Sequence, residues 1–263
     1  MIRNLPSMLA LALSVCACSG GAQDEAPPPP PVDDPVASGT SGSYTVRLYS
    51  AGALQVGVNA LALEVETAGG TPVTDAALSL LPLFTPGSGA SHRCPVLGPE
   101  AAGGDGRYPL RAVFQVPGEG GTWTADVAVT RDGSTSAVPL SELAVVRGKD
   151  LAVTFESGGT GYVMALEFLA APRVGVVPVA VTLHETADAG ATFTAASDAA
   201  LALVPDMPDM GHGGGEGGAD PTLVRAGWYE GSVSFTMPGL WRVRVPASRA
   251  GESLGTPEFW VFF

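Results

Sequence analysis

The stretch Gly227-Trp228-Tyr229, followed by Met237-Pro238-Gly239-Leu240-Trp241, decides the fold because an earlier part of the chain repeats it. The earlier copy reads Gly106-Arg107-Tyr108, then Val116-Pro117-Gly118, then Trp123. Three further landmarks recur in the same order, namely Val56-Gly57-Val58 as Val174-Gly175-Val176, Asp75-Ala76-Ala77-Leu78 as Asp198-Ala199-Ala200-Leu201, and Pro82 as Pro205. All six offsets lie between 118 residues (241 − 123) and 123 residues (198 − 75). Such regular spacing predicts a tandem duplication.

Each copy has the pattern of a small all-β module. The chain of 263 residues contains 35 Gly and 23 Pro, which disfavours long helices. Short runs of alternating apolar and polar residues, broken by Gly and Pro, are typical of half-buried strands. The runs that fit are 60–66, 79–83, 112–116, 122–129, 179–184, 201–204, 231–237 and 240–246. We therefore expect two tandem immunoglobulin-like β-sandwiches, at residues 44–148 and 149–263, with Trp123 and Trp241 in their cores.

The N-terminal region is typical of an exported lipoprotein. Residues 1–17 combine one basic residue, Arg3, with a short apolar run, as secretory signal peptides do. Val15-Cys16-Ala17-Cys18 resembles the lipobox of bacterial lipoproteins, which implies acylation of Cys18 and anchoring in the lipid bilayer. By the same resemblance, Ser19 favours the outer membrane of a Gram-negative cell. The alternative is an ordinary signal peptide with a spare cysteine. Residues 18–43, with five consecutive prolines, predict a disordered tether.

Charge and cysteine content narrow the class of protein. Asp and Glu number 26 against 13 Lys and Arg, and a net charge of -13 excludes nucleic acid as a partner because phosphates are repelled. With Cys16 in the signal peptide and Cys18 acylated, Cys94 is left alone and no intrachain disulfide is expected. Cys94 is then either a small buried residue or an oxidation-prone thiol.

The second copy carries an additional motif, Met207-Pro208-Asp209-Met210-Gly211-His212, ahead of its Gly-Trp-Tyr and Met-Pro-Gly-Leu-Trp segments. This order resembles the YtkA-like and FixH-like family of small bacterial envelope domains over about residues 174–246. The resemblance implies an immunoglobulin-like sandwich outside the cytoplasm, in a family associated with envelope and copper-related contexts. The first copy keeps only the skeleton, with Phe84 in place of Met207 and Val116 in place of Met237.

The chemistry of this motif suits copper. Thioether sulfur favours Cu(I) and imidazole binds copper in either oxidation state, so Met207, Met210 and His212 form a candidate copper site. Met237 is a fourth candidate ligand, from a neighbouring strand. The alternative is that the methionines are adaptable apolar filler at the end of the sandwich.

Two other groups of potential ligands lie in loops. Calcium binding is a further hypothesis, because carboxylate oxygens are suitable ligands for calcium. The candidate ligands are Asp206, Asp209, Glu216 and Asp220. Their spacing does not match the helix-loop-helix calcium motif. A solvated acidic loop is the competing interpretation. His92 and Cys94 supply only two ligands, which do not make a site.

The chain has no common catalytic motif of the serine hydrolase, zinc protease or phosphate-binding classes. His184 and Glu185 are adjacent in a predicted strand, so they face opposite ways and do not form a general-base pair. We therefore expect a non-enzyme. Two functional hypotheses follow: a membrane-anchored binding and interaction module with an envelope protein partner, and a lipoprotein that binds or delivers Cu(I).

Overall fold

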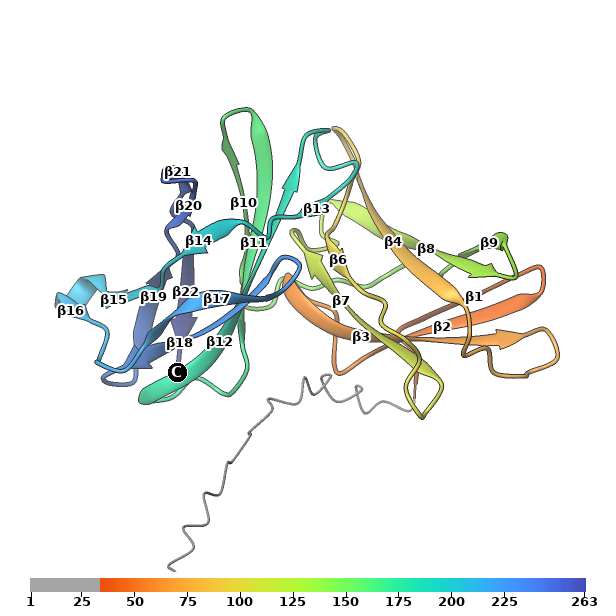
Figure 1. The fold of residues 1–263 in the computed structure, drawn as a ribbon, viewed down its shortest axis with the longest axis horizontal. Coiled ribbons are helices and arrows are strands. Elements are labelled where there is room, and N and C mark those ends of the chain that lie inside the picture. Colours follow the sequence, from red (N-terminus) through yellow and green to blue (C-terminus); the bar gives the residue numbers. More distant parts are fainter. Residues whose placement is uncertain (1–33) are drawn as a thin grey trace, which may run out of the picture.

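A computed structural model describes residues 34–263, which form two β-sandwich modules with separate hydrophobic cores (Figure 1). The predicted signal peptide, Cys18 and most of the predicted tether lie outside the described residues. Among residues 34–263 the only helical element is one short 3-10 helix, so the all-β prediction is confirmed. Nowhere in that range is there a helix of the length and apolarity needed to cross a membrane.

The first module contains nine strands, which are β1 (Ala37–Ser41), β2 (Tyr44–Ser50), β3 (Gly57–Thr67), β4 (Ala77–Pro86), β5 (His92–Arg93), β6 (Val96–Leu97), β7 (Arg107–Phe114), β8 (Gly121–Arg131) and β9 (Ser134–Pro139). The second contains β10 (Ala152–Ser157), β11 (Thr160–Phe168), β12 (Gly175–Thr186), β13 (Thr194–Ala195), β14 (Ala199–Leu201), β15 (Val204–Met207), the 3-10 helix η1 (Pro208–Met210), β16 (His212–Gly213), β17 (Ala219–Arg225), β18 (Trp228–Phe235), β19 (Leu240–Arg244), β20 (Ala247–Arg249), β21 (Glu252–Gly255) and β22 (Glu258–Phe262).

The two modules share one topology. In the first module the sheets run β1-β2-β3-β7-β6 and β5-β4-β8-β9. In the second they run β10-β11-β12-β18-β17 and β16-β15-β19-β22. Taken in order, these lists match β1 with β10, β3 with β12 and β8 with β19. The second module adds β13 beside β12 and a three-stranded sheet, β14-β20-β21. The shared strand order supports the duplication expected from the sequence.

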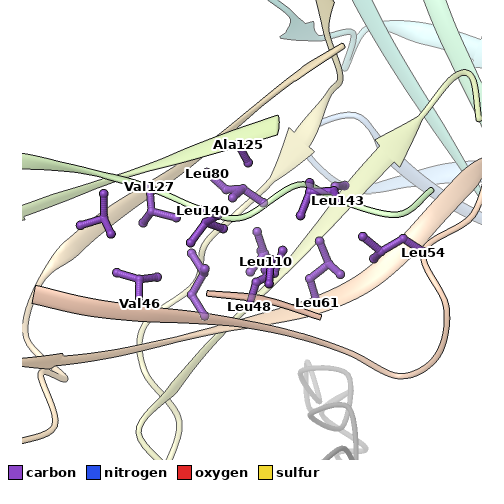
Figure 2. Packing of buried hydrophobic residues seen from close by; sticks show 14 of the residues in the cluster. Val46, Leu48, Leu54, Leu61, Leu80, Leu110, Ala125, Val127, Leu140 and Leu143 are labelled. Carbon is purple, nitrogen blue, oxygen red and sulfur yellow. The ribbon is translucent and has the colours of Figure 1, made fainter. Parts of the chain in front are cut away.

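Alternation of inward and outward side chains along the strands builds each core, and Figure 2 shows how buried residues of the first module pack together. In β8, Trp123, Ala125, Val127 and Val129 are buried, and the residues between them are exposed or partly exposed. Every second side chain of a strand lies on the same face, so this pattern directs one face of β8 inward. Leucines of the opposite sheet meet it in the core, among them Leu48, Leu61 and Leu110.

The repeated tyrosines make the same pair of hydrogen bonds in both modules. Each hydroxyl donates to one carbonyl and accepts from an amide N–H at the start of the following loop or strand. The bonds are Tyr108 to Val73 (3.0 Å) and Ala76 to Tyr108 (3.1 Å) in the first module, and Tyr229 to Ala196 (2.7 Å) and Ala199 to Tyr229 (3.3 Å) in the second. Corresponding atoms therefore fasten corresponding segments to the core.

The repeated tryptophans are equally matched. Trp123 Nε1 donates to the carbonyl of Val116 over 3.0 Å, and Trp241 Nε1 donates to the carbonyl of Met237 over 3.0 Å. Both rings are fully buried. The expectation that Trp123 and Trp241 pack in the two cores is confirmed.

The predicted tether, residues 18–43, ends earlier than the sequence indicates. Residues 37–41 form β1, which pairs with β2 along its whole length, and Ala37 is buried in the core. Gly39 lies so close to the carbonyl oxygen of Pro139 that a Cβ atom there would collide with it. Glycine at this position allows the two sheets to approach at their edge. Composition alone does not distinguish this use of glycine from a flexible linker.

The predicted strands 201–204 and 240–246 are also interrupted. Leu201 ends β14 and Val204 begins β15. The segment that pairs with both strands passes from β19 to β20 through Pro246. Proline has no amide hydrogen to give to a sheet, so the ladder breaks at that point. The second sheet of this module therefore splits in two, which the first module does not do.

The modules pack face to face through their five-stranded sheets. Val113 of β7 meets Val163 and Ala165 of β11 in a small apolar cluster of their own. Beside it, Arg111 is 8% exposed, and its guanidinium lies 4.5 Å from the ring centroid of Trp228. Arg111 Nε is 3.6 Å from Glu167 Oε2, so a cation of the first module is paired within the second.

A second arginine contacts the same ring. The guanidinium of Arg225 lies 5.0 Å from the ring centroid of Trp228, and its Nη1 is 2.7 Å from Glu100 Oε1 of the first module. Burial lowers the pKa of Arg111 and raises the pKa of Glu167, which Arg111 opposes. The centre of the junction is therefore a desolvated stack of Arg111 on the ring of Trp228, and the pair formed by Arg225 and Glu100 lies at its exposed rim.

Candidate functional site

The Met-His motif lies at one end of the second module. Met207 ends β15 and His212 begins β16, and the two residues are direct partners in this antiparallel pair. Partners of this kind carry their side chains on the same face of the ladder. Met207 is only 6% exposed and belongs to the core, whereas His212 is exposed.

The other two candidate ligands have different surroundings. Met237 is partly buried and packs against the same core as Met207. The Met207 methyl carbon lies next to Gly239, two residues beyond Met237, where an added Cβ would be 2.7 Å from it. Met210 ends η1 and is 54% exposed. The fold therefore gathers Met207, His212 and Met237 at one end of the sandwich and leaves Met210 in solvent.

The first module has a counterpart of this arrangement, in which Phe84 holds the place of Met207, as the sequence indicates, and His92 holds that of His212. Phe84 and His92 are partners in the pair β4 and β5, as Met207 and His212 are in β15 and β16. The rings of Phe84 and His92 lie 5.3 Å apart, and the ring of Trp123 lies 5.2 Å from Phe84 and 5.8 Å from His92. Strand register is needed to match His92 with His212, because the loops between the paired residues differ in length.

Two of the four acidic residues considered as calcium ligands are engaged in other contacts. Asp206 is held by Arg242 through two contacts, Nε to Oδ1 at 3.0 Å and Nη2 to Oδ2 at 2.7 Å, which keep the pKa of Asp206 below its usual value. Asp220 Oδ1 accepts the amide N–H of Leu203 at 2.9 Å. Between residues 34 and 263, no three His, Cys, Asp or Glu side chains gather closely enough to hold a metal ion. The structure therefore does not bring Asp206, Asp209, Glu216 and Asp220 together as a calcium-binding group of side chains.

The remaining sites singled out in the sequence are internal. His184 is 3% exposed, and burial lowers its pKa to about 4. Glu185 instead binds Arg249 (2.8 Å), so the absence of a general-base pair is confirmed. Cys94 is 5% exposed and burial strongly raises its pKa, so the first alternative, a small buried residue, is the correct one.

An exposed apolar strip lies on the outer face of the β16-β15-β19-β22 sheet. It consists of Leu240, Trp260 and Phe262, which are 45%, 46% and 76% exposed, and it is called the outer strip below. Leu240 and Phe262 are direct partners across β19 and β22. Sequence reasoning missed these residues, although the signal is present: in β22, Phe259 and Val261 are buried while Trp260 and Phe262 alternate outward.

Charged side chains hold the outer strip in place. Arg242, the partner of Trp260, has its guanidinium 5.8 Å from the centroid of that ring. The same guanidinium contacts Asp206 on β15 and Glu258 on β22 (Nη1 to Oε1, 3.3 Å). An arginine fixed by two carboxylates restricts the aromatic ring that it contacts. Arg242 is therefore held beside Trp260, one of the three residues of the outer strip.

Comparison with known proteins finds only distant similarity. No family model and no curated protein matches the chain. Solved structures that align with it include the Escherichia coli adhesin FdeC (14% identity, 82% of this chain, 63% of that chain, TM-score 0.28), the D0-D1 domain of intimin (14%, 86%, 100%, 0.24) and invasin, a bacterial integrin-binding protein (15%, 84%, 39%, 0.27). The chain thus spans less than two thirds of the FdeC and invasin chains. Scores this low assign neither family nor function.

Proposed function

We propose that the protein is a non-enzymatic, membrane-anchored lipoprotein of the cell envelope whose two modules act as a binding and interaction unit for an envelope protein. The outer strip is the observation that carries this proposal. It combines Trp260 and Phe262 with a fixed arginine, the residue types enriched in the centres of protein interfaces. It also lies on the sheet that does not contact the first module, where a partner has access (Figure 1).

The position of β22 suggests how the partner binds. β22 pairs with β19 on one side and is the edge of its sheet, so its other side presents backbone hydrogen-bonding groups. A strand of the partner added beside β22 would pair with this edge and place its side chains next to Trp260 and Phe262. The proposed partner is therefore an envelope protein with an extended segment.

Photo-cross-linking in cells tests this surface. A photoreactive phenylalanine analogue at Phe262 should give a discrete adduct with an envelope protein. The same analogue at Leu223, which is 46% exposed on β17, is the matched control and should not. Trp260→Ser should reduce the adduct formed from position 262. Equal labelling from both positions, or an adduct that is insensitive to Trp260→Ser, would contradict the proposal.

The membrane anchor is a separate part of the proposal. It rests on Cys18 and the lipobox-like residues before it, which lie outside the described structure. Cys18→Ser should abolish acylation and release the protein from the membrane fraction, and gradient separation of the membranes should place the wild type in the outer one. Unchanged partitioning of Cys18→Ser would refute anchoring through this residue.

Binding or delivery of Cu(I) is the second candidate function. It is favoured by the pairing of Met207 with His212 and by the turn after Met237 that contacts Met207, which bring two thioethers and an imidazole to the same end of the module. We expect a form of the protein starting after Cys18 to bind Cu(I) anaerobically. Replacing Met207, Met210 and His212 with alanine should remove that binding.

The burial of Met207 requires a gentler second variant. Met207→Leu combined with His212→Ala keeps an apolar side chain in the core while removing two ligands. His92→Ala is the matched control, because His92 holds the corresponding position in the first module. Copper stoichiometry and affinity equal to the wild type in both motif variants would exclude this site.

A further inference from the structure

A cleft of about 540 Å³ opens at the junction of the two modules, on a surface separate from the outer strip. The first module contributes His92 and Gln115, and the second contributes Thr154 and Glu156 of β10 and Thr186 at the end of β12. The connection between β12 and β13 closes one side, where the carbonyl of Gly190 accepts the amide N–H of Arg93 at 2.8 Å. The volume falls within the range of roughly 300–1,000 Å³ that is typical of ligand pockets, which favour domain junctions.

The cleft contains hydrogen-bonding groups that the protein does not fully use. Gln115 Nε2 donates to the carbonyl of Arg93 at 3.2 Å, but Gln115 Oε1 is buried and has no partner among the described residues. Because that oxygen has almost no accessible surface, the hydrogen-bonding groups open to a ligand are those of β10. Glu156 adds an exposed carboxylate, and Thr154 adds a hydroxyl on the same face of β10.

The charge and surface of the cleft limit what it can bind. None of the described residues that line it is Lys or Arg, and burial lowers the pKa of His92, which disfavours the charged form of its imidazole. A carboxylate without a cation disfavours anionic ligands. Phe193 and Phe155 add partly exposed apolar surface, which the apolar faces of a ring can cover while its hydroxyls reach the polar groups.

We propose that this junction cleft binds a neutral saccharide. A neutral saccharide supplies hydroxyl donors for the Glu156 carboxylate, an acceptor for the Thr154 hydroxyl, and C–H faces for Phe193. The inference goes beyond the proposed protein partner, because it concerns a different surface and does not depend on the membrane anchor or on the outer strip.

Titration of the isotope-labelled protein, residues 19–263, with cellobiose, maltotriose and N,N'-diacetylchitobiose tests the inference by two-dimensional NMR. At least one saccharide should cause saturable shifts that are centred on the amides of Gln115, Thr154, Gly161 and Gly190. Thr154→Trp places a large ring at the mouth of the cleft and should weaken that binding at least about tenfold. Thr40→Trp is the matched control, since Thr40 is an exposed threonine on β1, the counterpart of β10.

Three outcomes would overturn the inference. They are the absence of saturable shifts with all three saccharides, shifts centred away from the cleft, and equal binding by wild type and Thr154→Trp. Digalacturonate provides a charge control, and binding of this dianion as tight as that of the neutral saccharides would contradict the assigned ligand class. Unchanged binding by Trp260→Ser would separate this site from the proposed protein partner.

Discussion

At the scale of single residues, the hydroxyls of Tyr108 and Tyr229 make equivalent hydrogen bonds in the two modules. Each hydroxyl donates a hydrogen bond to the carbonyl of a buried residue and accepts one from a backbone amide N–H. Removing the hydroxyl leaves both backbone groups short of a partner, although the ring still fills its space. Equivalent substitutions in the two modules should therefore have similar costs.

Tyr108→Phe and Tyr229→Phe should each lower the free energy of unfolding by about 1–3 kcal/mol. Tyr44→Phe is the control, because Tyr44 is partly buried and its hydroxyl makes no hydrogen bond within the described residues. Urea denaturation monitored by tryptophan fluorescence gives the comparison. A loss in Tyr44→Phe as large as in the other two would contradict the role given to the hydroxyl bonds.

His184 makes stability depend on pH. Its pKa is about 4 in the folded protein because burial disfavours the charged form, and it is about 6.5 in an unfolded chain. Between these values the unfolded state binds a proton that the folded state does not, so the free energy of unfolding falls as the pH decreases. The full loss from pH 6.5 to pH 4 amounts to about 3 kcal/mol.

The variant His184→Gln isolates this contribution from that of the carboxylates. Unfolding curves of both proteins at pH 7, 6, 5 and 4 should show a wild type that loses more stability toward acid than the variant does. A difference between the two proteins that stays constant over this range would show that His184 does not titrate on unfolding as described.

Residue chemistry was only partly readable from the sequence. The inward role of Trp123 and Trp241 follows from strand alternation, and the opposed faces of His184 and Glu185 follow from the same rule. The burial of Met207 next to an exposed His212 does not, because it depends on which end of β15 the core reaches. Phe84 pairs with His92 as Met207 pairs with His212. Recognising these pairings requires the strand register, which cannot be read from the sequence.

At the scale of secondary structure elements, β1 shows how a strand can resemble a linker. Its five residues are Ala, Ser, Gly, Thr and Ser, yet it is paired throughout with β2 and lies against β9. The strand positions 60–66, 122–129 and 179–184 were predictable because bulky apolar residues alternate there. β1 was not predictable from this pattern, because its close approach to β9 requires small side chains rather than hydrophobic ones.

Gly39→Ala should destabilise the first module by about 1–3 kcal/mol, because the added methyl group meets the carbonyl oxygen of Pro139 and the strands must separate. Gly52→Ala is the control, since no atom lies within 4 Å of its added Cβ. Thermal unfolding should show a lower Tm for Gly39→Ala only. Equal melting of the two variants would mean that β1 does not need its close approach to β9.

At the scale of the whole molecule, the two modules pack against each other at the junction. A duplicated sequence predicts two similar units but not which outer faces meet. The contact unites Arg111 with Trp228 and Glu167, which lie far apart in the chain. In the structure, β12 has a run of residues buried on both faces, Ala180 to His184, as a strand covered on both sides requires.

Arg111→Ala should uncouple the modules. It leaves Glu167 without its cation and one face of Trp228 uncovered, which weakens the junction by about 2 kcal/mol or more. We expect one calorimetric unfolding transition in the wild type and two in the variant, with a larger radius of gyration by small-angle X-ray scattering. Arg131→Ala removes an exposed ion pair with Asp75 and is the control, with no such change. A single unchanged transition in Arg111→Ala would contradict the coupling.

The buried stack on Trp228 also has a consequence for ionic strength. Mobile ions screen charges that face water, so the contact between Arg225 and Glu100, whose side chains are 35% and 42% exposed, weakens as salt rises. Arg111, at 8% exposure, is largely shielded from those ions. The angle between the modules should therefore stay the same in dilute and in concentrated salt, while the rim of the junction loosens.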